Sequence, residues 1–305
     1  MAENFTVAAL YCFAPLPHYR ALRAPLMAVG REAGIKGSLL LAAEGLNGTV
    51  AGSKDGIARL IAFITAQKGL EKPELKYSTA QAMPFRRLKV RLKKEIVTMG
   101  VAGIDPLQIV GTYVAPQDWN ALIQDEDTIL IDTRNDYEYV LGSFAGAIDP
   151  EIKTFRDFPQ WLQDHAAELR GKKNIAMFCT GGIRCEKSTA YAKKLGYANV
   201  YHLQGGILKY LEEIPAEESL WQGECFVFDE RVSLGHGLKQ GGLKLCRACR
   251  RPLTADDKNS PLYVEGISCA ACYYEHSDTD RARYAERQKQ AALAKKRHTA
   301  PHIGG

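Results

Sequence analysis

Apolar residues near the start of the chain follow first the period of a strand and then that of a helix. The segment Phe5–Phe13 is continuously rich in apolar residues and is typical of a buried strand. In residues 17–33, by contrast, Leu22, Leu26 and Val29 recur at helical spacing. The opening therefore predicts a strand followed by an amphipathic helix.

The same alternation continues to about residue 100. A turn is expected at Glu44–Gly48, with one strand before it at residues 38–43 and one after it at 49–51. A helix is then expected at 54–67 and a further strand at 87–97. The resulting order of strand, helix, strand, strand, helix, strand is the split βαβ pattern. Residues 1–100 are thus predicted to form a ferredoxin-like α+β domain.

Short apolar strands alternate with helical patterns between residues 112 and 220, which predicts a second, α/β domain. The runs Ile129–Ile131 and Asn174–Phe178 are apolar without interruption, as in strands that are buried on both faces of a parallel sheet. Ligands of such sheets bind beyond the carboxyl ends of the strands. We therefore expect the functional groups of this domain directly after these two runs.

One of these runs ends in the sequence Cys179-Thr180-Gly181-Gly182-Ile183-Arg184, with a helix expected from about Cys185. Paired glycines let successive N–H groups turn inward at the start of the helix, where they stabilise an anion. Together with the charge of Arg184 they should lower the pKa of Cys179 and make it a reactive thiolate. The alternative is an ordinary buried cysteine before a tight turn; the arginine and the paired glycines after a strand favour the reactive thiolate. Cys185 is either a resolving thiol or only the first residue of the helix, and we favour the second.

The chain changes character after residue 220. Residues 235–242 are rich in glycine, and the segment 221–280 has too few large apolar residues to form a core unaided. It contains two CxxC units nineteen residues apart, Cys246 with Cys249 and Cys269 with Cys272, the spacing of a four-thiolate zinc site. Structural zinc is favoured over a redox pair or an empty site, because a metal would supply the missing stabilisation. Residues 281–305 form a basic tail, with disorder expected over 299–305.

Positive charge is concentrated in two places. Residues Arg87, Lys89, Arg91 and Lys93 alternate with leucine and valine, so one face of a strand would carry four cations. This face is either an RNA phosphate track or a solvated sheet surface, and the pattern alone favours neither. The tail adds a second cluster: Arg281, Arg283, Arg287, Lys289, Lys295, Lys296 and Arg297.

Composition limits the remaining possibilities. A chain of 305 residues fits two or three domains, and its net charge of +5 does not by itself establish a polyanionic partner. We expect no secretory leader and no membrane span, and hence a cytoplasmic protein. Its eight cysteines are then expected to stay reduced, as metal ligands or reactive thiols.

Several of these segments resemble a rhodanese domain: Ile131–Arg134, Glu138 with 142–147, Cys179–Arg184 and Tyr201–Gly206. The resemblance implies that Cys179 carries sulfur as a persulfide. It also implies that Asp132 and Arg134 pair within the domain and brace the loop. Related phosphatases separate the cysteine and arginine by five residues, whereas only four separate them here, which favours sulfur over phosphate chemistry.

Over nearly its whole length the chain resembles the rhodanese-containing tRNA uridine hydroxylases, in the segments already named and in 44–49, Gly111–Tyr113 and 223–229. The resemblance implies oxygen-dependent 5-hydroxylation of the wobble uridine of tRNA, with Cys179 as catalytic residue and molecular oxygen as co-substrate. A plain sulfurtransferase and a non-enzymatic RNA-binding protein are the alternatives. The residues identify no electron donor and no oligomeric state.

Overall fold

The computed structural model describes residues 4–297 and divides into two compact units, one up to Gly241 and one from Gly242 onward. The first unit contains the N-terminal domain and the α/β domain. The second contains the four clustered cysteines.

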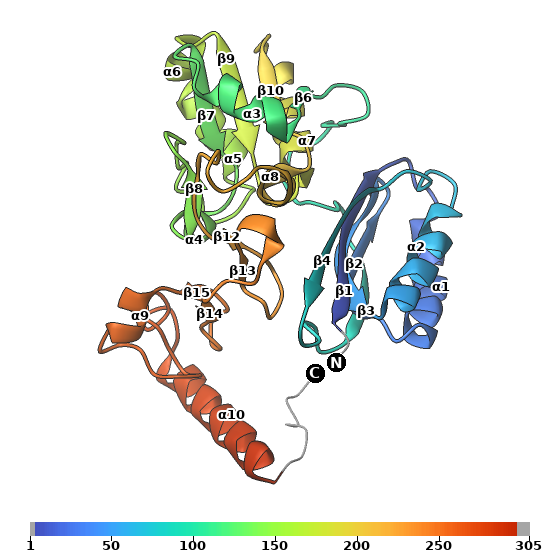
Figure 1. The fold of residues 1–305 in the computed structure, drawn as a ribbon, viewed down its shortest axis with the longest axis vertical. Helices are drawn as coiled ribbons and strands as arrows, with labels where there is room; N and C mark the ends of the chain where they lie inside the picture. The colour runs from blue at the N-terminus through green and yellow to red at the C-terminus, as the bar shows by residue number, and fades with distance from the viewer. Residues whose placement is uncertain (1–3, 298–305) are drawn as a thin grey trace. The chain divides into compact units, whose positions relative to one another are not determined.

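The N-terminal domain is one five-stranded sheet with the strand order β4-β1-β3-β2-β5. Two helices cover one of its faces (Figure 1). The elements are β1 (Phe5–Phe13), α1 (Tyr19–Glu32), β2 (Lys36–Ala42), β3 (Gly45–Gly52), α2 (Lys54–Thr65), β4 (Glu74–Ala80) and β5 (Leu88–Leu92). The order of the first four strands is that of a ferredoxin-like domain, which confirms the predicted fold class.

Two details of the prediction for this domain were wrong. The strand that completes the motif is β4, whereas the expected strand at 87–97 is the shorter β5, which adds to the edge of the sheet parallel to β2. The sequence of β4 is mostly polar, so its apolar pattern is weak. Strand β3 also begins at Gly45, inside the expected turn. Gly45 adopts a φ of 142°, and a Cβ there would lie 2.0 Å from the carbonyl oxygen of Cys12.

The register of the sheet determines which residues share its second face, which is not covered by the helices. Lys89, Ser38, Thr49, Ala9 and Lys76 are aligned across β5, β2, β3, β1 and β4. Residues aligned in register lie on the same side of a sheet. The predicted basic strand therefore shares a face with Thr49 and Lys76.

The α/β domain contains a parallel four-stranded sheet in the order β6-β10-β9-β7. Its elements are β6 (Thr112–Val114), α3 (Pro116–Ile123), β7 (Thr128–Asp132), α4 (Asp136–Tyr139), α5 (Phe158–Asp164), α6 (Ala166–Arg170), β9 (Asn174–Phe178), α7 (Ile183–Lys194), β10 (Val200–Leu203) and α8 (Gly206–Glu213). The predicted runs at 129–131 and 174–178 form β7 and β9, which are neighbours in this sheet. Their carboxyl ends therefore meet at the same edge.

The first unit extends past the expected boundary at residue 220. Strand β11 (Trp221–Gly223) pairs with β8 (Gly142–Phe144), and β12 (Cys225–Phe226) pairs with β13 (Ser233–Leu234), ahead of the short helix η1 (His236–Leu238). Trp221, Cys225 and Leu234 are buried in the core of the α/β domain. The unit boundary thus lies at Gly241, because these apolar residues pack against the preceding domain.

A buried lysine connects the two domains of the first unit. The Nζ atom of Lys187, on α7, lies 2.8 Å from a carboxylate oxygen of Glu44 and 2.7 Å from one of Glu95. It also donates a hydrogen bond to the carbonyl of Val97, at 3.1 Å. Helix α7, which follows the Cys179 loop, is therefore held against the N-terminal domain by charge.

The second unit is small and contains β14 (Lys244–Leu245), β15 (Pro252–Leu253), α9 (Ala255–Asn259) and α10 (Asp278–Lys296). The segment predicted as a basic tail is helical up to Lys296, and the expected disorder over 299–305 lies outside the described residues. No helix in the described ranges is both long enough and apolar enough to cross a bilayer.

Candidate active site and cysteine cluster

The loop at Cys179 connects strand β9 to helix α7, as the sequence predicts. Gly182 caps α7 with a φ of 98°, a conformation that favours glycine. Gly206 fits closely beneath the loop, since a Cβ on it would lie 2.5 Å from the carbonyl oxygen of Cys179. Glycine at these two positions lets the loop curl tightly around the sulfur.

Cys179 has no solvent-exposed surface, and its Sγ accepts a hydrogen bond of 3.1 Å from the N–H of Gly182. Burial by itself raises the pKa of this thiol. A hydrogen bond from Cys185, the charge of Arg184 and backbone N–H groups together outweigh burial and lower the pKa below its usual value. The loop therefore favours a thiolate at position 179.

Cys185 lies in the first turn of α7 and is fully buried, with its Sγ 3.7 Å from the hydroxyl of Thr133. Burial and the neighbouring Cys179 sulfur raise the pKa of Cys185 well above its usual value. Cys185 is therefore a neutral thiol that donates to the Cys179 sulfur.

The guanidinium of Arg184 is bound to a carboxylate that the sequence analysis did not assign to the site. It donates hydrogen bonds of 2.7 and 2.8 Å to the two carboxylate oxygens of Glu138 and one of 3.1 Å to Thr180. Glu138 is fully buried; burial raises its pKa, but the contacts with Arg184 outweigh this and leave the pKa lowered. Arg184 thus anchors the loop internally, and its positive charge is neutralised.

The predicted pairing of Asp132 with Arg134 is present as a fully buried ion pair of 2.6 Å. Arg134 also donates a 2.6 Å hydrogen bond to the carbonyl of Gly142, and its guanidinium lies 6.0 Å from the centre of the Phe178 ring. Phe178 directly precedes Cys179. The pair therefore supports the strand that carries the loop, without reaching the sulfur.

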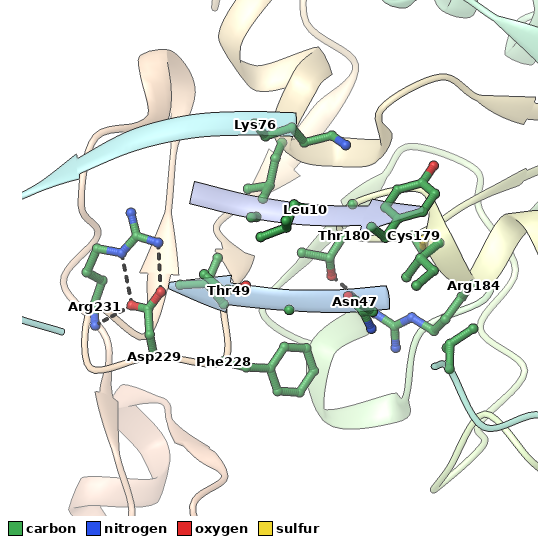
Figure 2. Close-up of a pocket in the computed structure, with 18 residues that line it drawn as sticks. Leu10, Asn47, Thr49, Lys76, Cys179, Thr180, Arg184, Phe228, Asp229 and Arg231 are labelled. Carbon is green, nitrogen blue, oxygen red and sulfur yellow. Dashed lines mark hydrogen bonds and ion pairs between the residues drawn. The ribbon is translucent and has the colours of Figure 1, made fainter. Parts of the chain in front are cut away.

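Cys179 lines a cavity of about 300 Å³ that lies between the loop and the second face of the N-terminal sheet (Figure 2). One wall comes from β1, β3 and β4 and includes Ala9, Asn47, Thr49 and Lys76; another is the Cys179–Arg184 loop; the third is the segment after β12, with Val227, Phe228, Asp229 and Arg231. The Cys179 loop is thus covered by the N-terminal domain.

The third wall of the cavity combines an ion pair with an exposed aromatic ring. Asp229 and Arg231 form a buried ion pair of 2.7 Å, and Arg231 donates a further 2.7 Å hydrogen bond to Ser78 of β4. This fixes the segment against the N-terminal sheet. Between β12 and the ion pair, the side chain of Phe228 is 66% exposed (Figure 2). A large exposed aromatic ring beside a cavity is a natural platform for a planar ligand.

Behind the loop, Glu186 of α7 accepts hydrogen bonds of 3.0 Å from Tyr11 and 2.7 Å from Tyr113. Burial raises the pKa of Glu186, and the two hydroxyl groups partly offset this effect. Tyr11 belongs to the N-terminal sheet and Tyr113 to β6. Glu186 therefore joins the two domains next to the loop.

The predicted basic strand borders a groove of about 700 Å³ between β5 and α1. Among residues 4–297 no acidic residue lines this groove, and seven cations do: Arg23, Arg31, Lys36, Arg86, Arg87, Lys89 and Arg91. As predicted, the leucines and the valine of the strand pack against the core. The fourth predicted cation, Lys93, is exposed but does not line the groove, because the strand ends at Leu92.

The four predicted cysteine ligands come together in the second unit, with their Sγ atoms all within 4.8 Å of one another. Three of the sulfur–sulfur distances are 3.9 Å for Cys246–Cys272, 3.8 Å for Cys249–Cys269 and 3.7 Å for Cys269–Cys272. Zinc with four thiolates at about 2.3 Å in a tetrahedron places its sulfurs about 3.8 Å apart. The cluster therefore has the dimensions of a metal site.

Several residues of the site were not predicted: Asn47, Lys76, Glu138, Glu186, Phe228 and Arg231. Most belong to segments far from Cys179 in the sequence and are brought to it by the packing of the two domains. Of these, Glu138, Asn47 and Phe228 lie in segments that carry the family resemblance, which could have indicated them.

Comparison with known proteins agrees with this arrangement. Residues 5–96 match the model of the UPF0176 acylphosphatase like domain, and residues 115–213 match that of the rhodanese-like domain. The tRNA uridine(34) hydroxylases of Brucella ovis and of Brucella suis biovar 1 are each 67% identical to the chain over 300 residues. These alignments cover 98% of the chain, and 98% and 97% of the two relatives.

The chain belongs to the tRNA uridine(34) hydroxylase family. The family and the enzyme class that the sequence resemblance implied are thereby confirmed, and the non-enzymatic alternative is discarded. The rhodanese-like match also accounts for the Cys179 loop.

Proposed function

We propose that this protein hydroxylates C5 of uridine 34 in tRNA, with Cys179 as the catalytic nucleophile and molecular oxygen as the source of the hydroxyl group. The observation that carries the proposal is the cavity in which a buried thiolate faces the N-terminal sheet. A base turned out of the anticodon loop would enter this cavity. Unpaired bases are the usual targets of sequence-specific RNA recognition.

The proposed chemistry raises the electron density at C5 of uracil, so that C5 can react with oxygen. The sulfur of Cys179, as a thiolate or persulfide, forms a bond to C6, and the C5=C6 electron pair shifts toward C5 and the C4 carbonyl oxygen. C5 then becomes electron-rich and reacts with oxygen. One oxygen atom stays on C5, and an external two-electron donor reduces the other to water. Loss of the C5 proton then restores the C5=C6 bond, the sulfur–C6 bond breaks and Cys179 is released.

The tRNA backbone is proposed to bind in the groove beside β5. Its cations, which include the predicted Arg87, Lys89 and Arg91, would neutralise phosphates, and the predicted Lys93 follows just beyond the end of β5. The face of the sheet that carries Lys89 also carries Thr49, which lines the cavity. Lys89 therefore connects the groove to the face of the sheet from which Thr49 lines the cavity.

Phe228 is proposed to stack on the base that enters the cavity. Stacking on an aromatic side chain contributes about 1–3 kcal/mol per base in proteins that bind single strands. The adjacent Asp229–Arg231 ion pair holds this segment in place.

The four-cysteine cluster is proposed to hold structural zinc through Cys246, Cys249, Cys269 and Cys272, in agreement with its sulfur–sulfur distances. Four thiolates leave no open coordination position. Zinc would therefore stabilise the small second unit, whose buried cluster consists mainly of these cysteines, and take no part in hydroxylation.

A rhodanese-type sulfurtransferase is the second candidate, because the Cys179 loop itself would suit a persulfide. Nucleoside mass spectrometry of tRNA separates the two functions, in a strain that lacks this gene and any parallel hydroxylation route. If 5-hydroxyuridine-derived nucleosides return with the native gene but not with Cys179→Ser, the hydroxylase proposal holds. A loss of thiolated nucleosides alone would support the sulfurtransferase, and unchanged nucleosides would contradict both.

A further inference from the structure

Four charged side chains line the cavity at Cys179: Lys76, Arg184, Asp229 and Arg231. Arg184 is neutralised by Glu138, and Asp229 and Arg231 neutralise each other. Lys76 has no hydrogen-bond or ion-pair partner among residues 4–297. It is only 8% exposed, and in Figure 2 its side chain extends from β4 toward the end of the cavity that holds Cys179 and Thr180.

The described surroundings of Lys76 act on its charge only from a distance and give its Nζ no hydrogen bond. Its Nζ lies 5.4 Å from the centre of the Tyr11 ring on β1, a modest cation–π contact. Four other groups influence it electrostatically without a hydrogen bond: Glu74 of its own strand, the Cys179 sulfur, Lys209 of α8 and Glu186 of α7. Glu74 is exposed, and Glu186 already accepts two tyrosine hydroxyl groups.

A buried ammonium without a partner is unfavourable, because it has lost its hydration without gaining hydrogen bonds. Burial is accordingly the main effect on Lys76 and lowers its pKa. An electron-rich atom that enters the cavity would remove this penalty by accepting a hydrogen bond from Nζ. The cavity is thus prepared for a ligand with an acceptor atom.

We propose that Lys76 is a positioning residue that donates a hydrogen bond to the C4 carbonyl oxygen of the uracil in this cavity. The inference rests on the proposed function and adds a substrate contact to it. The C4 oxygen is conjugated with the C5=C6 bond. When sulfur adds to C6, negative charge moves onto this oxygen, and its hydrogen bond to the ammonium becomes stronger. A phosphate is a poorer fit, since most of the cavity lining is apolar and the cationic groove lies elsewhere on the domain.

The test compares Lys76→Met and Lys76→Arg with the exposed control Lys72→Met. Each variant is induced in the deletion strain, and the rate at which 5-hydroxyuridine-derived nucleosides appear is followed by mass spectrometry. Lys76→Met should lower this rate about 100-fold, the effect of removing one donor to a developing oxyanion. Lys76→Arg should recover part of the rate, and Lys72→Met should behave as the native protein.

Two further measurements separate positioning from a structural role. The affinity of purified Lys76→Met for the tRNA and the rate of Cys179 alkylation at pH 7 should both match those of the native protein, because the loop itself holds the pKa of Cys179 at about 5. An unchanged hydroxylation rate in Lys76→Met would overturn the inference. So would a loss of Cys179 alkylation at pH 7, because Lys76 would then be needed for the thiolate and not for the base. If the native protein itself produces no hydroxylated nucleoside, the proposed function fails and this inference fails with it.

Discussion

The guanidinium of Arg184 is bound by the carboxylate of Glu138 through two hydrogen bonds, of 2.7 and 2.8 Å. Both side chains are almost completely buried. The arginine of the Cys179 loop is therefore neutralised inside the protein. Its main task is to hold the loop in shape, while backbone N–H groups and the Cys185 thiol make the direct contacts with the sulfur.

Replacement of Glu138 by glutamine should strongly destabilise the first unit. The variant leaves the guanidinium of Arg184 buried without a counter-charge, which costs about 3 kcal/mol or more. Urea unfolding measures this loss. Glu213→Gln is the matched control, because its partner Lys209 is partly exposed and such pairs contribute at most about 1 kcal/mol. Equal losses in the two variants would contradict the role given to Glu138.

Cys179 should react with iodoacetamide at a rate that stays nearly constant between about pH 8 and pH 6, because its lowered pKa keeps it a thiolate there. A thiol with the ordinary pKa of about 8.5 would lose about tenfold in rate per pH unit over this range. Labelling of the peptide at each pH is quantified by mass spectrometry. Cys185, whose pKa is raised, should stay unlabelled. A tenfold fall per unit for Cys179 would show that the loop does not favour the thiolate.

Replacement of Lys187 by methionine should loosen the contact between the two domains of the first unit. Glu44 and Glu95 would lose their shared partner, at a cost of about 3 kcal/mol. Hydrogen exchange should show faster opening of the backbone around Ile96 and Met99. Lys194→Met, at the far end of the same helix, is the control.

The same contact predicts a pH dependence. Burial raises the pKa of Glu95, but hydrogen bonds from Lys187 and the Met99 N–H outweigh it, so the pKa is lowered in the folded protein. Its contribution to stability is therefore complete above the ordinary glutamate pKa of about 4.3 and is lost as the pH falls through the lowered value. In Lys187→Met this part of the acid destabilisation should disappear. An identical acid profile in both proteins would contradict the pairing.

Removal of zinc should unfold the second unit and leave the first intact. Cys246→Ser should lose bound zinc and lose protection from proteases from about residue 242 onward, because the cysteines make up most of the buried cluster there. Metal analysis and limited proteolysis measure the two effects. Cys12→Ser, in the N-terminal sheet, should keep one zinc per chain. Full protection of the second unit in metal-free protein would contradict a structural role.

Reversal of charge in the groove beside β5 should weaken tRNA binding at every salt concentration. Arg91→Glu should also lower the slope of log affinity against log salt by about 1, the change expected for one lost phosphate contact. Lys173→Glu makes the same charge change at an exposed position of the α/β domain, outside the groove, and should leave the slope unchanged. Equal slopes of log affinity against log salt in the two variants would show that the RNA does not bind in the groove beside β5.

The sequence predicted best those features that depend on neighbours along the chain. The strand–loop–helix unit at Cys179 and the alternation of the basic strand both follow from local residue pattern, and both are present. The paired CxxC units also assemble as expected, because their spacing is the one that tetrahedral coordination of a metal by four thiolates requires.

Features that depend on packing between distant segments were not predictable in this way. Lys76 lies on β4, a strand too polar to be recognised from its pattern, and its burial results from the docking of the α/β domain. Phe228 reaches the cavity because the residues after 220 pack onto the preceding domain. The boundary expected at 220 had separated these residues from the site.

Growth under ¹⁸O₂ shows whether Cys179 directs oxygen onto the wobble uridine. The deletion strain is complemented with the native gene, with Cys179→Ser or with Cys12→Ser. The masses of the wobble nucleosides of its tRNA are then measured by mass spectrometry. With the native gene and with Cys12→Ser, the 5-hydroxyuridine-derived nucleosides should carry one heavy oxygen, and with Cys179→Ser they should be absent. A hydroxyl group without the heavy isotope, or labelled nucleosides in the Cys179→Ser strain, would contradict it.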